Sequence, residues 1–252
     1  MSGHSKWATI KRKKAVNDAQ RSKNFAKLIR LIEVAAKQGG PDLAGNPGLA
    51  EAVQKAKKNS VPNDNIDRAI KRGSGLTGEH INYVSLVYEV KAFDGVALLV
   101  ECLTDNKNRC AAGIRSIVTR SGCSMVNPGS LAYNFKRKGI VVLQDRDANG
   151  NLLSEDLVLS AVLEAEVDDI VPTGDCGFEI IAEPSNLSAV CNALRDSGIQ
   201  YRSVETVYVP NSTVSLPEQK YDRIIRMIEA LEESDDVQGV YTNLSGKDLA
   251  CE

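Results

Sequence analysis

The sequence feature that most constrains the fold is a βαββαβ order of periodic patterns between residues 140 and 209. The strand patterns are short apolar or alternating runs, and the two helix patterns carry apolar residues at helical spacing. The elements predicted in this stretch are strand 140–143, helix 155–165, strand 169–171, strand 177–182, helix 187–197 and strand 201–209. This order is typical of the ferredoxin-like split βαβ unit. We therefore predict a ferredoxin-like α+β domain over residues 139–209, which begins where Lys138-Gly139 interrupts the preceding strand pattern.

A second α+β domain is predicted from the patterns on both sides of this unit. Before it come strands 84–91, 96–103 and 131–136 and helix 107–121, and after it come helix 218–233 and strand 240–243. Together these elements predict a domain made of residues 80–138 plus 210–246, into which residues 139–209 are inserted.

The N-terminal part of the chain has the pattern of a small helical domain. Helices are predicted from Asn17 to about Gly39, from about Gly48 to Asn59 and from Asp64 to Arg72, with Asn17 and Asn63 as N-caps. In the first helix the apolar residues, such as Leu28 and Ile32, form one stripe; Lys23, Lys27 and Arg30 lie off it, facing solvent or a ligand. The predicted fold class is α+β multidomain, with a three-helix domain (residues 1–75) before two α+β, ferredoxin-like domains.

Charge is distributed very unevenly along the chain. Residues 1–75 contain 16 Lys and Arg against 6 Asp and Glu, while the remainder contains 15 Lys and Arg against 27 Asp and Glu. Because the two parts nearly cancel, the net charge of -2 conceals this asymmetry. Residues 1–16 form a basic arm, and such a run most often neutralises the phosphates of a nucleic acid, although a solvated tail is the alternative. Trp7 within the arm could stack on a base or anchor the arm against the first helix. The predicted nucleic-acid-binding residues are Lys6, Trp7, Lys11, Arg12, Lys13, Lys14, Arg21, Lys23, Lys27, Lys107 and Arg109.

Other local motifs have structural interpretations beside functional ones. Residues 105–109 (Asp-Asn-Lys-Asn-Arg) predict a helix cap by Asp105 or Asn106, or a phosphate grip at a helix start. The G-x-G-x-x-G of residues 73–78 follows a helix, not a strand, and indicates a helix end and linker. Residues 145–156 imitate an EF-hand loop, but a strand precedes them and Asp156 replaces the usual Glu, which favours a polar turn. The acidic residues between 229 and 236 predict a surface that restricts where nucleic acid lies.

Composition argues against a metalloenzyme, a secreted protein and a membrane protein. The six cysteines include no C-x-x-C pair and the chain has two histidines, so we predict small buried thiols, no metal, no cofactor and no catalytic residue. There is no apolar run of the roughly 20 residues that span a bilayer, and the N-terminus lacks the apolar region of a secretion signal. We expect a cytoplasmic protein without membrane contact, with a monomer favoured as its oligomeric state.

Four segments resemble the YebC family. They are Gly3-His-Ser-Lys-Trp-Ala, residues 61–75 (Val-Pro-Asn-Asp-Asn-Ile-Asp-Arg-Ala-Ile-Lys-Arg-Gly-Ser-Gly), residues 103–109 and residues 231–243. The resemblance spans nearly the whole chain and implies three domains, one helical and two α+β. One departure concerns the loop between the first two strands, where the family usually carries Gly-Pro-Gly-Gly and this chain has Ala92-Phe-Asp-Gly95.

The resemblance also implies a nucleic-acid partner. Bacterial members are described as transcriptional regulators that bind DNA, the mitochondrial relative as a translational activator, and bacterial members have also been tied to the ribosome and to proline-rich peptides. We therefore predict a non-enzymatic regulator of gene expression that is a DNA-binding transcriptional regulator. The alternative is a ribosome-associated translation factor that binds ribosomal RNA and aids synthesis of difficult, proline-rich peptides. The sequence has no obvious recognition helix with Arg, Asn or Gln set to read base edges.

Overall fold

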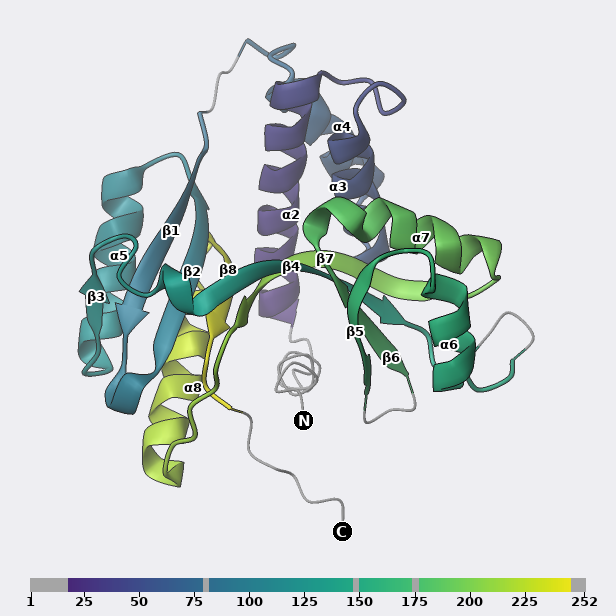
Figure 1. The fold of residues 1–252 in the computed structure, drawn as a ribbon. Coiled ribbons are helices and arrows are strands. Elements are labelled where there is room, and N and C mark those ends of the chain that lie inside the picture. The colour runs from purple at the N-terminus through teal and green to yellow at the C-terminus, as the bar shows by residue number, and fades with distance from the viewer. Residues whose placement is uncertain (1–17, 79–81, 147–149, 174–176, 246–252) are drawn as a thin grey trace.

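The computed structural model describes residues 18–78, 82–146, 150–173 and 177–245. Within these ranges the chain forms three helices followed by two four-stranded antiparallel sheets, each covered by two helices (Figure 1). This arrangement confirms the predicted fold class.

The three-helix domain consists of α2 (Asp18–Gly39), α3 (Pro47–Lys58) and α4 (Asn63–Gly73). The predicted stripe of α2 is buried, with Ile32 fully covered, and it packs against Leu49 of α3 and Ile66 of α4. The N-cap prediction for α4 is wrong, because Asn63 is the first helical residue and Pro62 occupies the N-cap without a side-chain hydrogen bond. Proline suits the start of a helix since its nitrogen has no hydrogen to satisfy.

Gly73 allows the end of α4 to approach the backbone of α2. A Cβ atom at this position would lie 2.3 Å from the carbonyl oxygen of Glu33 and 2.8 Å from its Cα. The first glycine of the G-x-G-x-x-G motif therefore serves helix packing, and the motif follows a helix as predicted.

Replacing Gly73 with alanine is expected to destabilise the three-helix domain by about 2–3 kcal/mol, because backbone atoms of Glu33 cannot move aside as a side chain could. Urea unfolding followed by helical circular dichroism measures the effect. Gly113, in the helix α5 (Lys107–Arg120), is the control, since nothing lies within 4 Å of a Cβ there. Alanine at that position should stabilise its helix slightly. Equal stability of the two variants contradicts the packing role.

The first sheet has the strand order β3-β1-β2-β8 and is covered by α5 and α8. Its elements are β1 (Val84–Lys91), β2 (Ala97–Thr104), α5 (Lys107–Arg120), β3 (Ser124–Val126), α8 (Glu218–Glu232) and β8 (Val237–Thr242). Buried residues from both helices, including Ile114 and Met227, pack on the inner face of the central strand β2. The turn between β1 and β2, where the chain departs from the family pattern, is held against α8. There the Asp94 carboxylate accepts a 2.6 Å hydrogen bond from Lys220, and Arg223 stacks 4.9 Å from the centre of the Phe93 ring.

The second sheet has the strand order β5-β6-β4-β7, which is the order of the predicted split βαβ unit. Its elements are β4 (Phe135–Leu143), α6 (Glu155–Val162), β5 (Val167–Pro172), β6 (Phe178–Ala182), α7 (Leu187–Asp196) and β7 (Tyr201–Pro210). All of them lie between β3 and β8 in the sequence, although the domain boundaries themselves stay a prediction.

One continuous strand, β4, replaces the two strands predicted at 131–136 and 140–143. Gly139 does not break the strand; it pairs with Ala182 on one side and Thr206 on the other. A Cβ atom at Gly139 would lie 2.4 Å from the side chain of Leu187, so the glycine makes room for α7 to pack on the strand.

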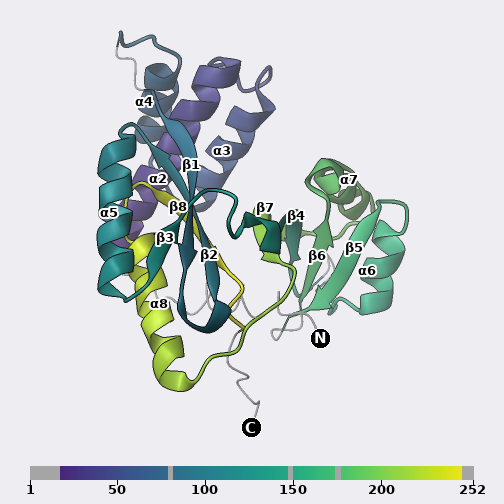
Figure 2. The ribbon, with the colours of Figure 1, turned by 60° about the vertical axis from the view of Figure 1, so that its left-hand side comes forward.

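The three-helix domain meets both sheets. In Figure 1, α2 stands between the first sheet with α5 and α8 on one side and the second sheet with α6 and α7 on the other. Figure 2 shows α5 and α8 together on one side of the first sheet, with β4 and β7 on its other side. The two sheets share a small cluster in which Phe135 is buried with Leu99, and the rings of Tyr208 and Tyr241 meet edge to face at 5.2 Å.

Candidate nucleic-acid interface

Most of the predicted nucleic-acid-binding residues belong to the N-terminal basic region, and six of them lie outside the described residues. These six are Lys6, Trp7, Lys11, Arg12, Lys13 and Lys14. Arg21 and Lys23 lie in the first turns of α2, at the end of the helix that the arm leads into. The remaining three, Lys27, Lys107 and Arg109, have described side chains and lie near the start of α5 and the end of α8.

Lys27 and Arg30 contact the corner between α8 and β8, whereas the sequence pattern predicted that they face solvent or a ligand. The Lys27 ammonium donates a 2.6 Å hydrogen bond to the carbonyl oxygen of Glu232. The Arg30 guanidinium donates to the carbonyl oxygen of Asp235 at 2.5 Å and to the carboxylate of Asp236 at 2.9 Å. The apolar stripe predicted from the sequence is the buried side of α2. The remaining surface of that helix lies partly against solvent and partly against the domain that contains the first sheet.

Arg109 is engaged by two carboxylates. Its guanidinium donates to Asp105 at 2.6 Å and to Asp236 at 3.3 Å, and these contacts raise the pKa of Arg109 while the hydrogen bond from Arg109 lowers the pKa of Asp105. Asn106 accepts a 3.0 Å hydrogen bond from the backbone N–H of Arg109, which confirms it as the N-cap of α5. A phosphate at this helix start would compete with Asp105 for Arg109, while the side chain of Lys107 is exposed beside it.

Asp236 joins the three-helix domain to the first sheet. It is 7% exposed, and its carboxylate contacts Arg30 of α2 and Arg109 of α5. One of the acidic residues between 229 and 236 is therefore a buried partner of two arginines, and the repulsive surface predicted for this group stays a prediction.

Replacing Asp236 with asparagine is expected to weaken this junction by about 2 kcal/mol, since Arg30 loses its carboxylate partner and Arg109 keeps only Asp105. Amide hydrogen exchange in α2 and β8 should become faster, and urea unfolding should begin earlier. Asp235→Asn is the matched control, because the Asp235 side chain is exposed and only its backbone carbonyl contacts Arg30. Unchanged exchange in Asp236→Asn argues against the junction.

Tyr83 lies beside the same junction. The Arg30 guanidinium is 5.9 Å from the centre of its ring. Burial, and then the nearby Glu33, raise the pKa of the Tyr83 hydroxyl to about 12. Glu33 is itself buried, and its carboxylate forms an ion pair with the guanidinium of Arg72 of α4 at 2.9 Å. This chain of contacts fixes the position of α2 relative to β1.

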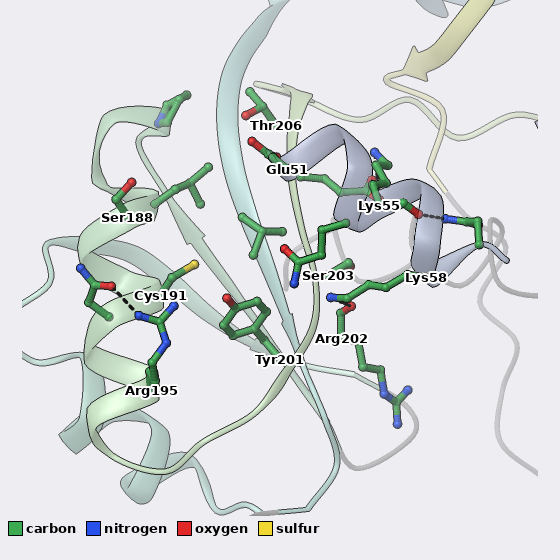
Figure 3. Close-up of a pocket in the computed structure, with 17 residues that line it drawn as sticks. Glu51, Lys55, Lys58, Ser188, Cys191, Arg195, Tyr201, Arg202, Ser203 and Thr206 are labelled. Carbon is green, nitrogen blue, oxygen red and sulfur yellow. Dashed lines mark hydrogen bonds and ion pairs between the residues drawn. The ribbon is translucent and has the colours of Figure 1, made fainter. Parts of the chain in front are cut away.

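A cleft of about 590 Å³ separates α3 from α7 and β7 (Figure 3). Its lining includes four cations that the sequence patterns did not group, Lys55, Lys58, Arg195 and Arg202, together with the carboxylates of Glu51 and Glu205. Figure 3 shows Tyr201 in the middle, with Arg195 of α7 on one side and Lys58 of α3 on the other. That Lys55 and Lys58 of α3 face α7 and β7 across this cleft depends on tertiary packing.

The other local motifs have ordinary structural roles wherever the structure describes their residues. Asp145, the first residue of the EF-hand-like run, forms an ion pair with Arg202 at 2.9 Å. The backbones of Arg146 and Leu152 form an antiparallel β-bridge. Cys102 and Cys110 are buried free thiols as predicted, whereas Cys123 and Cys191 are half-buried. Cys176 and Cys251 lie outside the described residues.

The described ranges contain neither a candidate metal site nor a candidate membrane span. In these ranges no group of three or more His, Cys, Asp or Glu side chains could hold a metal ion. None of the helices there has the length and apolar character needed to cross a bilayer.

Comparison with known proteins covers nearly the whole chain. Residues 5–76 match the TACO1/YebC protein N-terminal domain, and residues 83–244 match the TACO1/YebC second and third domain. A protein of Leifsonia xyli named "Probable transcriptional regulatory protein" is 56% identical over 252 residues, which is 100% of this chain and 97% of that protein. A protein of Mycolicibacterium gilvum with the same descriptive name is 56% identical over 97% of this chain and 95% of its own length.

A solved structure has the same fold. The crystal structure of a conserved hypothetical protein from Aquifex aeolicus superimposes with a TM-score of 0.80 at 37% sequence identity, over 94% of this chain and 96% of that chain. The matches to all three domains, the relatives and this structure agree with the motifs at residues 3–8, 61–75, 103–109 and 231–243, and the chain belongs to the TACO1/YebC family.

Proposed function

We propose that this protein is a non-enzymatic regulator of gene expression that binds nucleic acid through its basic N-terminal region. The observation that carries the proposal is the concentration of positive charge in residues 1–75, with 16 Lys and Arg against 6 Asp and Glu, on a chain that is otherwise acidic. Neutralising phosphates is the interaction for which such a distribution is suited.

The three-helix domain supports the proposal with a set of exposed cations beyond the arm. These are Lys55, Lys57 and Lys58 of α3 and Arg68 and Lys71 of α4. Because Lys27 and Arg30 contact the α8–β8 corner, we infer that phosphates contact these exposed cations of α3 and α4 in addition to the cations of the arm. Among the predicted site residues, the arm cations Lys6, Lys11, Arg12, Lys13 and Lys14 carry most of the proposed contact.

Within this proposal, the first candidate is a DNA-binding transcriptional regulator, in line with the names of the Leifsonia and Mycolicibacterium relatives. The second is a ribosome-associated translation factor that binds ribosomal RNA. It is favoured by the character of α3, whose three exposed cations are all lysines, because lysine acts as a point charge on backbone phosphates and base edges are more often read by Arg, Asn or Gln.

Crosslinking in living cells distinguishes the two candidates. The tagged protein is crosslinked, purified under denaturing conditions, and its attached DNA and RNA are both sequenced, while a parallel lysate is sedimented on a sucrose gradient. Enrichment of promoter DNA supports the transcriptional candidate; ribosomal RNA together with sedimentation beside ribosomal subunits supports the translational one. If neither nucleic acid is enriched over an untagged control, the proposed function is wrong.

A further inference from the structure

The cleft between α3, α7 and β7 combines features of a binding site for a single strand. On the side of α7 and β7 its lining carries two cations, Arg195 and Arg202, and one carboxylate, Glu205, although the chain after residue 75 has 15 Lys and Arg against 27 Asp and Glu. A basic spot in an otherwise acidic body is the electrostatic footprint of a polyanion partner. Here it also faces the basic helix α3 across the cleft.

Two of the four cations are free to meet a ligand. Lys55 lies 3.8 Å from Glu205, and Arg202 is held by Asp145 at 2.9 Å. Lys58, in contrast, contacts only the carbonyl oxygen of Arg202 at 3.4 Å and the ring of Tyr201, and Arg195 contacts Asn192 of its own helix at 3.0 Å. Within the described part of the chain, no carboxylate forms an ion pair with Lys58 or Arg195.

Tyr201 supplies an aromatic surface between these two cations. The Lys58 ammonium is 5.8 Å from the centre of the ring, and the ring is half-buried at the bottom of the cleft. Cationic grooves with an aromatic platform are the usual way in which proteins hold single strands, because every unpaired base has a face that can stack. The serine and threonine hydroxyls of Ser188, Ser203 and Thr206 add hydrogen-bonding groups along the same lining.

The size of the cleft limits what can enter it. A volume of about 590 Å³ is in the range of sites for small ligands, so it accommodates a nucleotide or two of a single strand, whereas a duplex can contact only its rim. The opening lies between two domains, so a strand in the cleft contacts α3 and the second sheet at once.

We propose that this cleft binds a short stretch of single-stranded nucleic acid, with phosphates between Lys58 and Arg195 and an unpaired base against Tyr201. The proposal rests on the proposed function and extends it, since it gives the protein a second contact region with a preference for unpaired nucleotides. The arm then supplies affinity for any phosphate backbone, and the cleft selects single-stranded or looped segments.

The test uses the full chain and fluorescence anisotropy with two probes, an unstructured oligouridylate of about 12 nucleotides and a DNA duplex. The double variant Lys58→Ala/Arg195→Ala is expected to bind the oligouridylate about tenfold more weakly at physiological salt. The slope of log Kd against log salt for this probe should fall by about 1.4, because each of the two lost phosphate contacts contributes roughly 0.7. Binding of the duplex should weaken by a smaller factor, because Lys58 also belongs to the proposed backbone contacts of α3 whereas Arg195 lies only in the cleft. Both side chains are exposed on helices, so the substitutions leave the fold intact.

Arg115→Ala/Arg120→Ala is the matched control, because it removes two exposed cations from α5, which lies away from the cleft (Figure 1). Tyr201→Leu should weaken oligouridylate binding severalfold and leave its salt slope unchanged, as expected for stacking.

If the cleft double variant binds the oligouridylate as tightly as the α5 double variant does, the cleft proposal is wrong, while duplex binding by the arm can still support the proposed function. If the unmodified chain binds neither probe, both fail. A poly-glutamate peptide that displaces the oligouridylate at equal charge concentration also overturns the proposal, in favour of an acidic protein partner.

Discussion

Replacing Asn46 with alanine is expected to destabilise the three-helix domain by about 3 kcal/mol, as the sum of a lost N-cap and the loss of hydrogen bonds to two half-buried carbonyl groups. Asn46 is 7% exposed and precedes α3. Its side-chain oxygen accepts a 3.0 Å hydrogen bond from the N–H of Leu49, and its amide nitrogen donates to the carbonyl oxygens of Ala35 and Gly40 at 2.8 and 2.9 Å. One side chain thus starts α3 and satisfies the end of α2.

Amide hydrogen exchange is the suitable measurement, because a chain with several domains does not have to unfold in a single step. Exchange of the amides in α2 and α3 should accelerate by about two orders of magnitude in Asn46→Ala, while that of α6 and α7 should be unchanged. Asn59→Ala is the control, because the exposed Asn59 amide makes a single hydrogen bond, to Lys55 at 2.8 Å. An effect no larger than that of the control contradicts the bridging role of Asn46.

Reversing the charge of Lys11, Arg12, Lys13 and Lys14 together is expected to lower nucleic-acid affinity on the order of 10³-fold at physiological salt. The estimate assumes that each cation contacts one phosphate and that each contact contributes about 0.9 to the salt slope. Affinity should fall equally for different DNA sequences, because phosphate contacts carry no sequence information. Anisotropy titrations at several salt concentrations measure both effects.

A control with the same change in net charge separates the arm from long-range electrostatics. Arg115, Arg120, Lys136 and Arg137 are exposed cations outside the three-helix domain, and their reversal should cost far less affinity. Equal losses in the two variants indicate that overall charge, not the arm, governs binding.

Regular periodicity predicted most of the fold. The apolar stripe of α2 and the βαββαβ order of the second sheet follow from patterns that extend over a whole element, and both are confirmed. Features that depend on a single close contact were missed. Gly139 resembles a strand break in sequence, but it is a strand interior where Leu187 approaches. The cap by Asn46 was missed although Asn46-Pro47 is a local signal for a helix start, and only the two hydrogen bonds from Asn46 to the end of α2 depend on tertiary packing.

The candidate site could be predicted only where its residues are neighbours in the sequence. The arm is a continuous run of cations and stands out from composition alone, and its role stays a prediction. Arg30 and Asp236 are far apart in the chain, so neither the junction they form nor the loss of Arg30 as a solvent-facing cation could be read from a local pattern. The same holds for Lys58 and Arg195, which line the same cleft only because the second sheet packs beside α3.

The most direct test of the central claim is the salt dependence of nucleic-acid binding by the unmodified protein. Dissociation constants for a DNA duplex and for a folded ribosomal RNA fragment are measured over a range of salt concentrations, and log Kd is plotted against log salt. If the basic arm neutralises phosphates, the plot for at least one ligand should be steep, with a slope of about 4 from four or more contacts. Binding that does not change with salt, or no binding of either ligand near physiological salt, contradicts the account.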